Sequence, residues 1–449
     1  MPEFLRAIGL GRATAMVVGT IIGASIFVQP SAIASAVPSI GGVLLIWIVA
    51  GAITLIGALI TAELSSAFPR TGGVYVYLKE AYSPAVGYLW GWAMFWSMHS
   101  GIIAALATVF GVYLGYLIDL RALGIDSRAF AVGSIVLLSM VNYIGVKHGS
   151  AVQAFFTAIK LIAILLVVAL GAMFVSRHGF PVAGRSAHGP LAISPGAFVT
   201  ALIAGLFAYG GWHMVTYASG ETKDPTHTIP RALLIGTLIV TAAYIAVNAA
   251  YLAVLPIETV ASANGVAAEF ADAVLGSGGR ELLSLLVVLS TLGGMTGIIL
   301  AGPRVYLAMS QDGLLFRWAG AVHPRFRTPH VAIVLQAIWS SVLALTGTYR
   351  ALFTRVVYTE WIFFALMAAS LFVLRRRASY QPAYRAWGFP VLPGIFVLSS
   401  LAIVTHQMVV QPIESLTGLA FVASGLPVYW FWSRRLQLSD KPQADKLTS

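Results

Sequence analysis

Apolar stretches of helical length recur along the whole chain, with short polar breaks between them. Each stretch is near the roughly 20 residues that an α-helix needs to cross about 30 Å of hydrocarbon. The short breaks leave no room for a large soluble domain. The pattern predicts an all-α integral membrane protein with about twelve transmembrane helices, at residues 14–37, 42–67, 84–117, 129–146, 152–175, 196–220, 231–255, 281–310, 331–347, 352–374, 390–410 and 414–433.

The composition agrees with a bilayer as the solvent for most of the chain. Charged residues make up 10% of the 449 residues and hydrophobic residues 59%, whereas about a quarter of a soluble chain is charged. The net charge is +11, and a cytoplasmic N-terminus places most Lys and Arg residues on the inner side, as the positive-inside rule requires. We therefore expect a multi-pass protein of the inner cell membrane with both termini cytoplasmic and no nucleic-acid partner.

Small residues interrupt two of the predicted spans near their middle. The first span reads GRATAMVVGTIIGASIFVQP and the sixth reads ALIAGLFAYGGWHMVTYASGE. One such cluster is usually a helix-packing feature. Two clusters five spans apart, at matching places in two halves of the chain, instead indicate broken helices around a transporter's midplane site.

A broken helix exposes amide N–H groups on one half-helix and carbonyl groups on the other, and a ligand must satisfy them. The half-helix that starts near Ser25 is suited to a carboxylate, because its amides and its dipole both attract an anion. Carbonyls near Ile21, Ile22, Phe207 and Ala208 are suited to an ammonium. The residues expected to bind substrate are Ile21, Ile22, Gly23, Ala24, Ser25, Ile26, Phe207, Ala208, Tyr209 and Gly210.

Several motifs resemble those of the amino acid–polyamine–organocation (APC) superfamily, and most closely its L-type amino acid transporters. They are TIIGASIFVQP in span one, AELSSAFPRTGGVYVYLKEAYSP after span two, LFAYGGW followed by ETKDP in span six, and STLGG in span eight. The resemblance runs over nearly the whole chain. It implies a LeuT-like fold, with a first inverted repeat at 1–180, a second at 181–380, peripheral spans at 381–435 and a cytoplasmic tail at 436–449.

The chain departs from the family pattern in the first break, where the usual Gly-Ser-Gly is Gly23-Ala24-Ser25. Ser25 brings a side chain that either narrows the site or adds a hydroxyl to it. Similar animal proteins pair with a glycoprotein subunit through a cysteine, and this chain has no cysteine. We therefore expect no disulfide-linked subunit, and the oligomeric state stays open.

Lys160 lies about two turns inside the predicted fifth span, where a charge costs a few kcal/mol unless it is paired. By resemblance, its ammonium takes the place of a sodium ion in sodium-coupled relatives and bridges span one to Ser290 of span eight. Phe207 resembles the family's aromatic gate. We expect the remaining basic residues to lie in loops and at helix ends.

Three further titratable residues have two open interpretations each. Glu360 in predicted span ten is either an acid lining the substrate path or an interfacial residue, and Arg355 one turn earlier is a possible partner. His99 and His213, in predicted spans three and six, are either structural hydrogen-bonding residues or proton carriers. At the inner ends of spans two and six, Glu63 and Arg70 with Glu221, Lys223 and Asp224 form either an ion-pair gate or a loop anchor.

The sequence thus predicts a secondary transporter of amino acids that works by alternating access, most simply a sodium-independent exchanger of neutral L-amino acids. The nearest alternative is proton-coupled symport of an amino acid or amine. An integral membrane enzyme would need a nucleophile, a metal motif or an acid–base cluster, and a channel would need a filter loop; the sequence shows neither set of motifs. We expect no cofactor and no metal.

Overall fold

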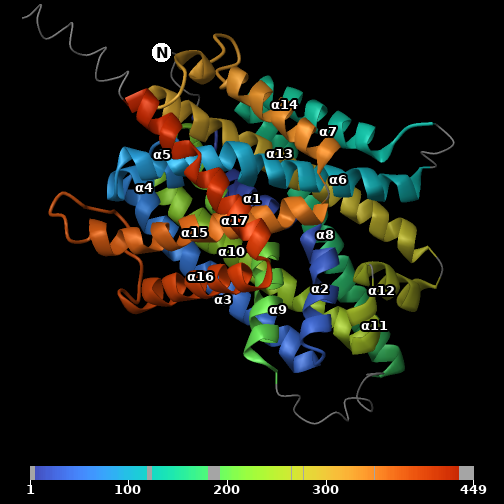
Figure 1. The fold of residues 1–449 in the computed structure, drawn as a ribbon. Helices are drawn as coiled ribbons and strands as arrows, with labels where there is room; N and C mark the ends of the chain where they lie inside the picture. The colour runs from blue at the N-terminus through green and yellow to red at the C-terminus, as the bar shows by residue number, and fades with distance from the viewer. Residues whose placement is uncertain are drawn as a thin grey trace, which may run out of the picture.

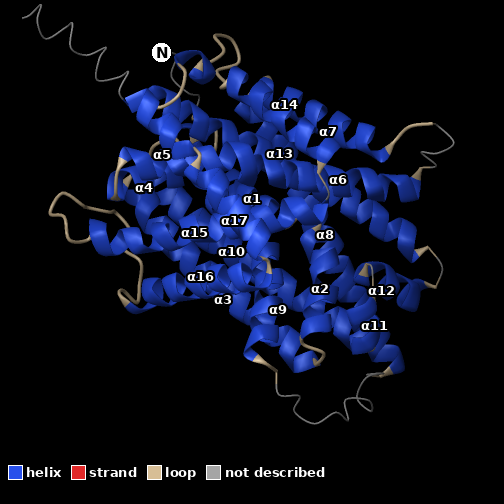
Figure 2. Cartoon of the chain, viewed as in Figure 1, coloured by secondary structure: helices blue, strands red, loops and turns tan. Residues whose placement is uncertain are grey.

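The computed structural model describes residues 6–118, 124–179, 193–263, 265–276, 278–347 and 349–433. For residues 280 and 349–357 it describes the backbone and not the side chains. Within these ranges the chain is built from helices, and strand pairing is limited to one bridge between Ile8 and Thr222 (Figure 2). The prediction of an all-α membrane protein is confirmed. The predicted tail at 436–449 lies outside the described residues.

The first half of the chain begins with a bent helix pair and ends with the longest helix of this half. Its elements are α1 (Leu10–Ile21), α2 (Ser25–Ala36), α3 (Ile40–Ala67), α4 (Val74–Ala81), α5 (Pro84–Ala93), the π-helical turn η1 (Met94–Met98), α6 (His99–Leu117), α7 (Ser127–Tyr143) and α8 (Val146–His178).

The second half repeats the theme of a helix that is interrupted early. Its elements are α9 (Pro195–Ala208), the 3-10 helix η2 (Trp212–Glu221), α10 (Pro225–Val254), α11 (Ile257–Ser262), α12 (Val266–Leu275), α13 (Gly279–Gln311), the 3-10 helix η3 (Arg317–Gly320), α14 (His330–Thr346), α15 (Tyr349–Leu374), α16 (Val391–Val410) and α17 (Pro412–Ala423).

Seven helical segments in the described ranges are long and apolar enough to cross a membrane, and the bent pair α1–α2 makes an eighth. Three shorter apolar helices, Ser127–Tyr143, His330–Thr346 and Tyr358–Leu374, coincide with further predicted spans. The last predicted span, 414–433, is helical but turns at Ser424. The helix count of twelve and the inverted repeat therefore stay predictions.

Local sequence explains where several helices begin. Ser39, Ser83 and Ser194 each accept a hydrogen bond from a backbone N–H three residues later, which caps α3, α5 and α9. Pro84 and Pro195 follow two of these caps, at a position where their missing N–H costs nothing.

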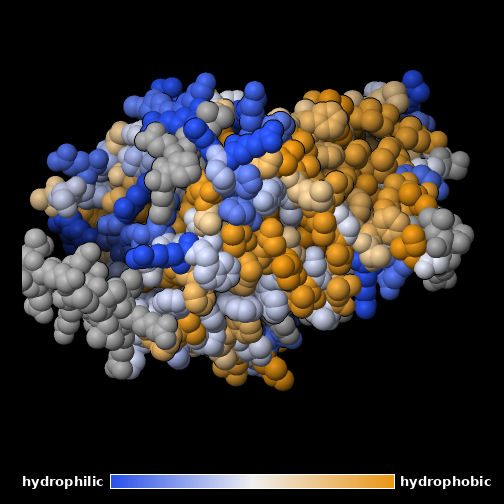
Figure 3. Space-filling model, turned by 90° about the horizontal axis from the view of Figure 1, so that it is seen from above, coloured by the Kyte–Doolittle hydropathy of each residue, from blue (hydrophilic) through white to orange (hydrophobic). Residues whose placement is uncertain are grey.

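The packing places α1 and α10 at the centre of the bundle, with α2 beside α9 and α11 (Figure 1). The pair α7 and α14 lies side by side at one edge. On the face drawn in Figure 3, hydrophobic residues form a broad continuous area and hydrophilic residues gather toward one end. That distribution suits a bundle whose flank contacts lipid and whose end contacts water.

Candidate functional site

The first predicted break is present in the structure. Helix α1 ends at Ile21, Ile22 has an extended backbone (φ −71°, ψ 94°), and α2 starts at Ser25 without a side-chain cap. The two helices are bent by 44° relative to each other. Because the first N–H groups of a helix have no partner within it, the start of α2 offers donors and the positive end of a helix dipole.

The second predicted break follows α9. The helix ends at Ala208, Gly211 has the left-handed φ of +99°, and η2 begins at Trp212. A Cβ on Gly211 would lie 2.9 Å from the carbonyl oxygen of Thr20, so this position requires glycine both for its φ and for its space. The Thr20 hydroxyl donates to the Gly211 carbonyl at 3.1 Å, which joins the two broken helices directly.

Tyr244 of α10 ties both breaks to a third helix. Its buried hydroxyl lies 3.1 Å from the carbonyl oxygen of Ile21 and 3.0 Å from that of Ala208. Tyr244 was not among the residues predicted to form the site. Tyr244 is one of the chain's 17 tyrosines and lies within an apolar run, where no local pattern distinguishes it.

Lys160 of α8 contacts the same region from another side. Lys160 is 3% exposed, and its ammonium donates to the carbonyl of Gly19 at 3.1 Å and to that of Ile22. A Cβ on Gly293 of α13 would lie 2.9 Å from Lys160 Cε, so the side chain is packed between α1 and α13. No hydrogen bond joins it to Ser290, whose hydroxyl has no partner among the described residues, and the role of Ser290 stays a prediction.

The carbonyls that we expected to bind an ammonium already accept hydrogen bonds from the protein. Ile21 and Ala208 accept from Tyr244, and Ile22 accepts from Lys160. Phe207 accepts from the Gly210 N–H at 3.0 Å. Each carbonyl oxygen keeps a second lone pair, so these bonds orient the carbonyls without excluding a ligand.

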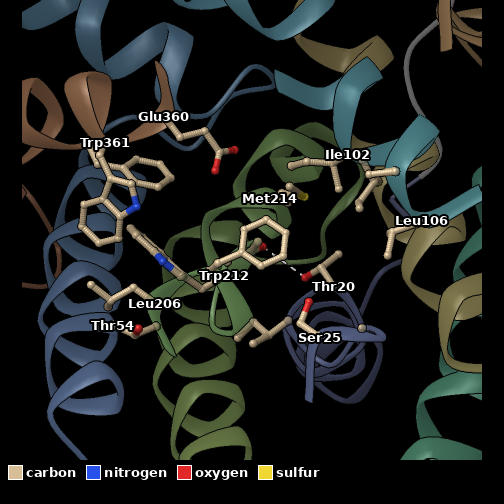
Figure 4. Close-up of a pocket in the computed structure, with 18 of the residues that line it drawn as sticks. Thr20, Ser25, Thr54, Ile102, Leu106, Leu206, Trp212, Met214, Glu360 and Trp361 are labelled. Carbon is tan, nitrogen blue, oxygen red and sulfur yellow. Dashed lines mark hydrogen bonds between the residues drawn. The ribbon is translucent and has the colours of Figure 1, made fainter. Parts of the chain in front are cut away.

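Both breaks line one internal cavity (Figure 4). Of the predicted binding residues, those that line it are Ile21, Gly23, Ala24, Ser25, Phe207 and Gly210. Ile22, Ile26, Ala208 and Tyr209 do not, and the Tyr209 hydroxyl donates to the Trp47 carbonyl at 3.2 Å. The space open to the centre of a water molecule is about 60 Å³, and one water needs about 10–15 Å³ on this measure. The cavity therefore has room for a small molecule.

Residues outside the predicted binding set complete the wall. Most are apolar, including Ile102, Leu106, Leu206, Met214 and Phe364. They come from α6, α9, η2 and α15, elements far apart in the chain. Only the folded bundle brings them together, so no sequence pattern identifies them.

The three titratable residues that had two possible interpretations lie at two places in the structure. Glu360 of α15 is buried and lines the cavity. His99 and His213 do not line it; both are fully buried in an aromatic cluster, where the His213 ring lies 4.9 Å from Phe364 and the His99 ring 5.7 Å from Tyr217. The side chain of Arg355, the partner considered for Glu360, is outside the described set.

Three of the charged residues considered for an ion-pair gate or a loop anchor pair with residues outside that group. Glu221 pairs with Arg304 of α13, Arg70 pairs with Glu80, and Glu63 pairs with Arg375, whose Nε lies 2.9 Å from its Oε1. The hydrogen bond with Glu63 raises the pKa of the Arg375 guanidinium. Arg304 is only 2% exposed and lies about two turns before the end of α13, so a second basic residue besides Lys160 is buried within a long helix. The Glu221 carboxylate makes Arg304 tolerable there.

Comparisons with known proteins agree with this architecture. The family model described as amino acid permease matches residues 8–431. The chain is 32% identical to the serine/threonine exchanger SteT of Bacillus subtilis (strain 168), over 96% of this chain and 97% of that protein. It is 30% identical to the human b(0,+)-type amino acid transporter 1, over 95% and 88% of the two chains, and 29% identical to the human large neutral amino acids transporter small subunit 2, over 96% and 81%.

Proposed function

The chain belongs to the amino acid permease family of the APC superfamily, and on that premise we propose that it exchanges neutral L-amino acids across the membrane without sodium. It is an amino acid transporter and not an enzyme, because the family and its relatives are permeases. The proposal concerns the substrate class, the exchange mode and the ions involved.

The observation that carries the proposal is that two broken helices meet at one cavity. At the α1 break, the uncapped start of α2 supplies amide donors for a carboxylate. The carbonyls of Ile21 and Phe207, which belong to lining residues of the two breaks and which Tyr244 and Gly210 hold in place, supply acceptors for an ammonium. An α-amino acid presents both charges on one carbon, so this pair of ends is suited to its backbone whatever its side chain.

Lys160 supports a cycle without sodium. Its ammonium occupies a buried position against the carbonyls of Gly19 and Ile22, which are the kind of oxygen ligands that a sodium ion would use. A second cation a few ångströms away would be repelled strongly at low dielectric.

The residues of the cavity wall support the proposal that the substrate is neutral and small. Apart from Glu360 it is made of apolar and uncharged polar residues, and its free space is about 60 Å³. Relatives named for serine and threonine and for large neutral amino acids are similar to this chain over nearly its whole length. We therefore place neutral amino acids first.

Proton-coupled symport is the second candidate, because Glu360 lines the cavity. A buried carboxylate that meets the substrate is a common proton carrier in membrane transport. In that scheme, an inward proton gradient would drive uptake without any luminal amino acid.

The topology that we propose with this function has residues 1–180 and 181–380 as inverted repeats, 381–435 as peripheral spans and both termini in the cytoplasm of an inner-membrane protein. With no cysteine, the chain forms no disulfide-linked subunit pair. An accessibility test on single cysteines at Lys147 and Lys223, both at predicted inner ends, would contradict this topology if both residues reacted from outside.

Uptake into proteoliposomes tests the function. Labelled neutral amino acid should enter fast only when the lumen holds unlabelled amino acid, and replacing external sodium with choline should leave the rate unchanged. Uptake into empty vesicles that follows an inward proton gradient would replace exchange with symport.

A further inference from the structure

Glu360 is the one charged side chain among the described residues that line the cavity. It comes from α15, on the wall across from the breaks, and Figure 4 shows its carboxylate directed into the cavity rather than away from it. Its neighbours on the wall include Trp361, Phe364 and Met214, which offer hydrophobic surface. The cavity therefore has an apolar wall with one strong hydrogen-bond acceptor.

This carboxylate lacks the partners that buried acids elsewhere in the protein have. Glu360 is 7% exposed, and its Oε1 has no hydrogen-bond partner in the part of the chain that the structure describes. By contrast, the buried Glu63 pairs with Arg375, and the buried Glu221 pairs with Arg304. A buried carboxyl oxygen without a donor is costly, and because Glu360 lines the cavity, a donor that occupies the cavity can satisfy it.

We propose that Glu360 is a specificity-determining residue that accepts a hydrogen bond from the side-chain hydroxyl of the substrate. The inference rests on the proposed function, because it needs the breaks to hold the amino acid's backbone. With the backbone held there, the substrate side chain extends toward the opposite wall, where Glu360 lies. The transporter then prefers small hydroxyl-bearing amino acids to apolar ones of the same shape.

Size and chemistry favour a hydroxyl over a cationic side chain. Lysine and arginine carry their charge on long methylene stems, whereas a hydroxyl on a one- or two-carbon side chain takes up less of the cavity's free space of about 60 Å³. A hydroxyl can donate to the carboxyl group in either of its protonation states, because a protonated acid keeps an acceptor oxygen.

Threonine and valine have nearly the same shape and differ in one hydroxyl, so they isolate this contact. We expect the wild-type protein to prefer threonine by about tenfold or more in exchange rate and in ligand-induced thermal stabilisation, since a site built to bond a hydroxyl rejects the analogue that lacks it. Glu360→Met should remove the preference. Glu360→Gln, which keeps an acceptor oxygen, should retain it. Glu258→Met, on the exposed surface of α11, is the matched control and should leave the preference unchanged.

Three results would overturn the proposal. The first is an unchanged threonine-to-valine ratio in Glu360→Met. The second is an equal loss in the Gln and Met variants, which would assign the effect to charge rather than to an acceptor. The third is wild-type binding of short cationic amino acids in preference to threonine. The thermal measurement needs no transport, so threonine-selective stabilisation without exchange would contradict only the proposed function.

Discussion

Replacing Lys160 with methionine should uncouple the α1 break from α8. Methionine keeps an unbranched apolar side chain of similar length but has no donor. Two carbonyl oxygens, those of Gly19 and Ile22, would lose their bond to the ammonium. We expect transport to fall while the fold persists.

The magnitude follows from the two hydrogen bonds. A hydrogen bond to a charged group contributes about 1.5–3 kcal/mol, so the pair amounts to about 3–6 kcal/mol before the cost of burying the ammonium is subtracted. If the break changes shape during transport, at least one of these bonds exists in one state only. Its loss then shifts the balance of states by about 1.5–3 kcal/mol, which corresponds to a rate reduction of roughly tenfold to a hundredfold.

Lys147 supplies a matched control, because it is also a lysine of α8 but is exposed at the start of the helix. Initial exchange rates would be measured in proteoliposomes at equal protein density for wild type, Lys160→Met and Lys147→Met. The control should match wild type. A Lys160→Met rate within twofold of wild type would refute the role assigned to the ammonium.

Three further substitutions test neighbouring contacts. Tyr244→Phe removes the hydroxyl that joins both breaks and should slow exchange about tenfold, because roughly 1–3 kcal/mol of hydrogen bonding is lost. Tyr251→Phe on the same helix is the control, because the Tyr251 hydroxyl has no partner among the described residues. Equal exchange rates in the two variants would contradict the bridging role of Tyr244. Gly211→Ala places a Cβ 2.9 Å from the Thr20 carbonyl oxygen at a positive φ and should abolish substrate-induced thermal stabilisation. Gly196→Ala, with open space around the added Cβ, should leave that stabilisation unchanged. A Gly211→Ala variant that still binds substrate would show that the breaks are not closely packed. Arg304→Gln leaves Glu221 buried without its partner and should destabilise the detergent-solubilised protein by about 3–5 kcal/mol in an unfolding assay; a change below about 1 kcal/mol would indicate that the pair is not a stabilising contact.

The membrane class and both breaks were predictable from the sequence because they depend on local patterns. Apolar runs of about twenty residues predict helices across a bilayer, and the small residues around Gly23 and Gly210 predict their interruption. Lys160 could also be selected, because a charge inside an apolar run is conspicuous in the sequence. These features need no knowledge of which helix lies beside which.

The rest depends on contacts between distant segments. Tyr244 reaches the breaks from α10, and Arg304 meets Glu221 only after α13 packs against η2. The sequence gives the position of Arg304 along a helix but not the buried carboxylate that neutralises it. The expected ammonium acceptors were also located by position alone, which could not reveal that the protein's own donors contact them.

Efflux from preloaded proteoliposomes tests exchange most directly. Vesicles would be loaded with labelled threonine, diluted into buffer without amino acid, and then given unlabelled threonine outside. If the protein is an exchanger, the label stays inside until external threonine is added and then leaves rapidly. Label that leaves at the same rate into amino-acid-free buffer would contradict exchange through a site that must be occupied to change its access.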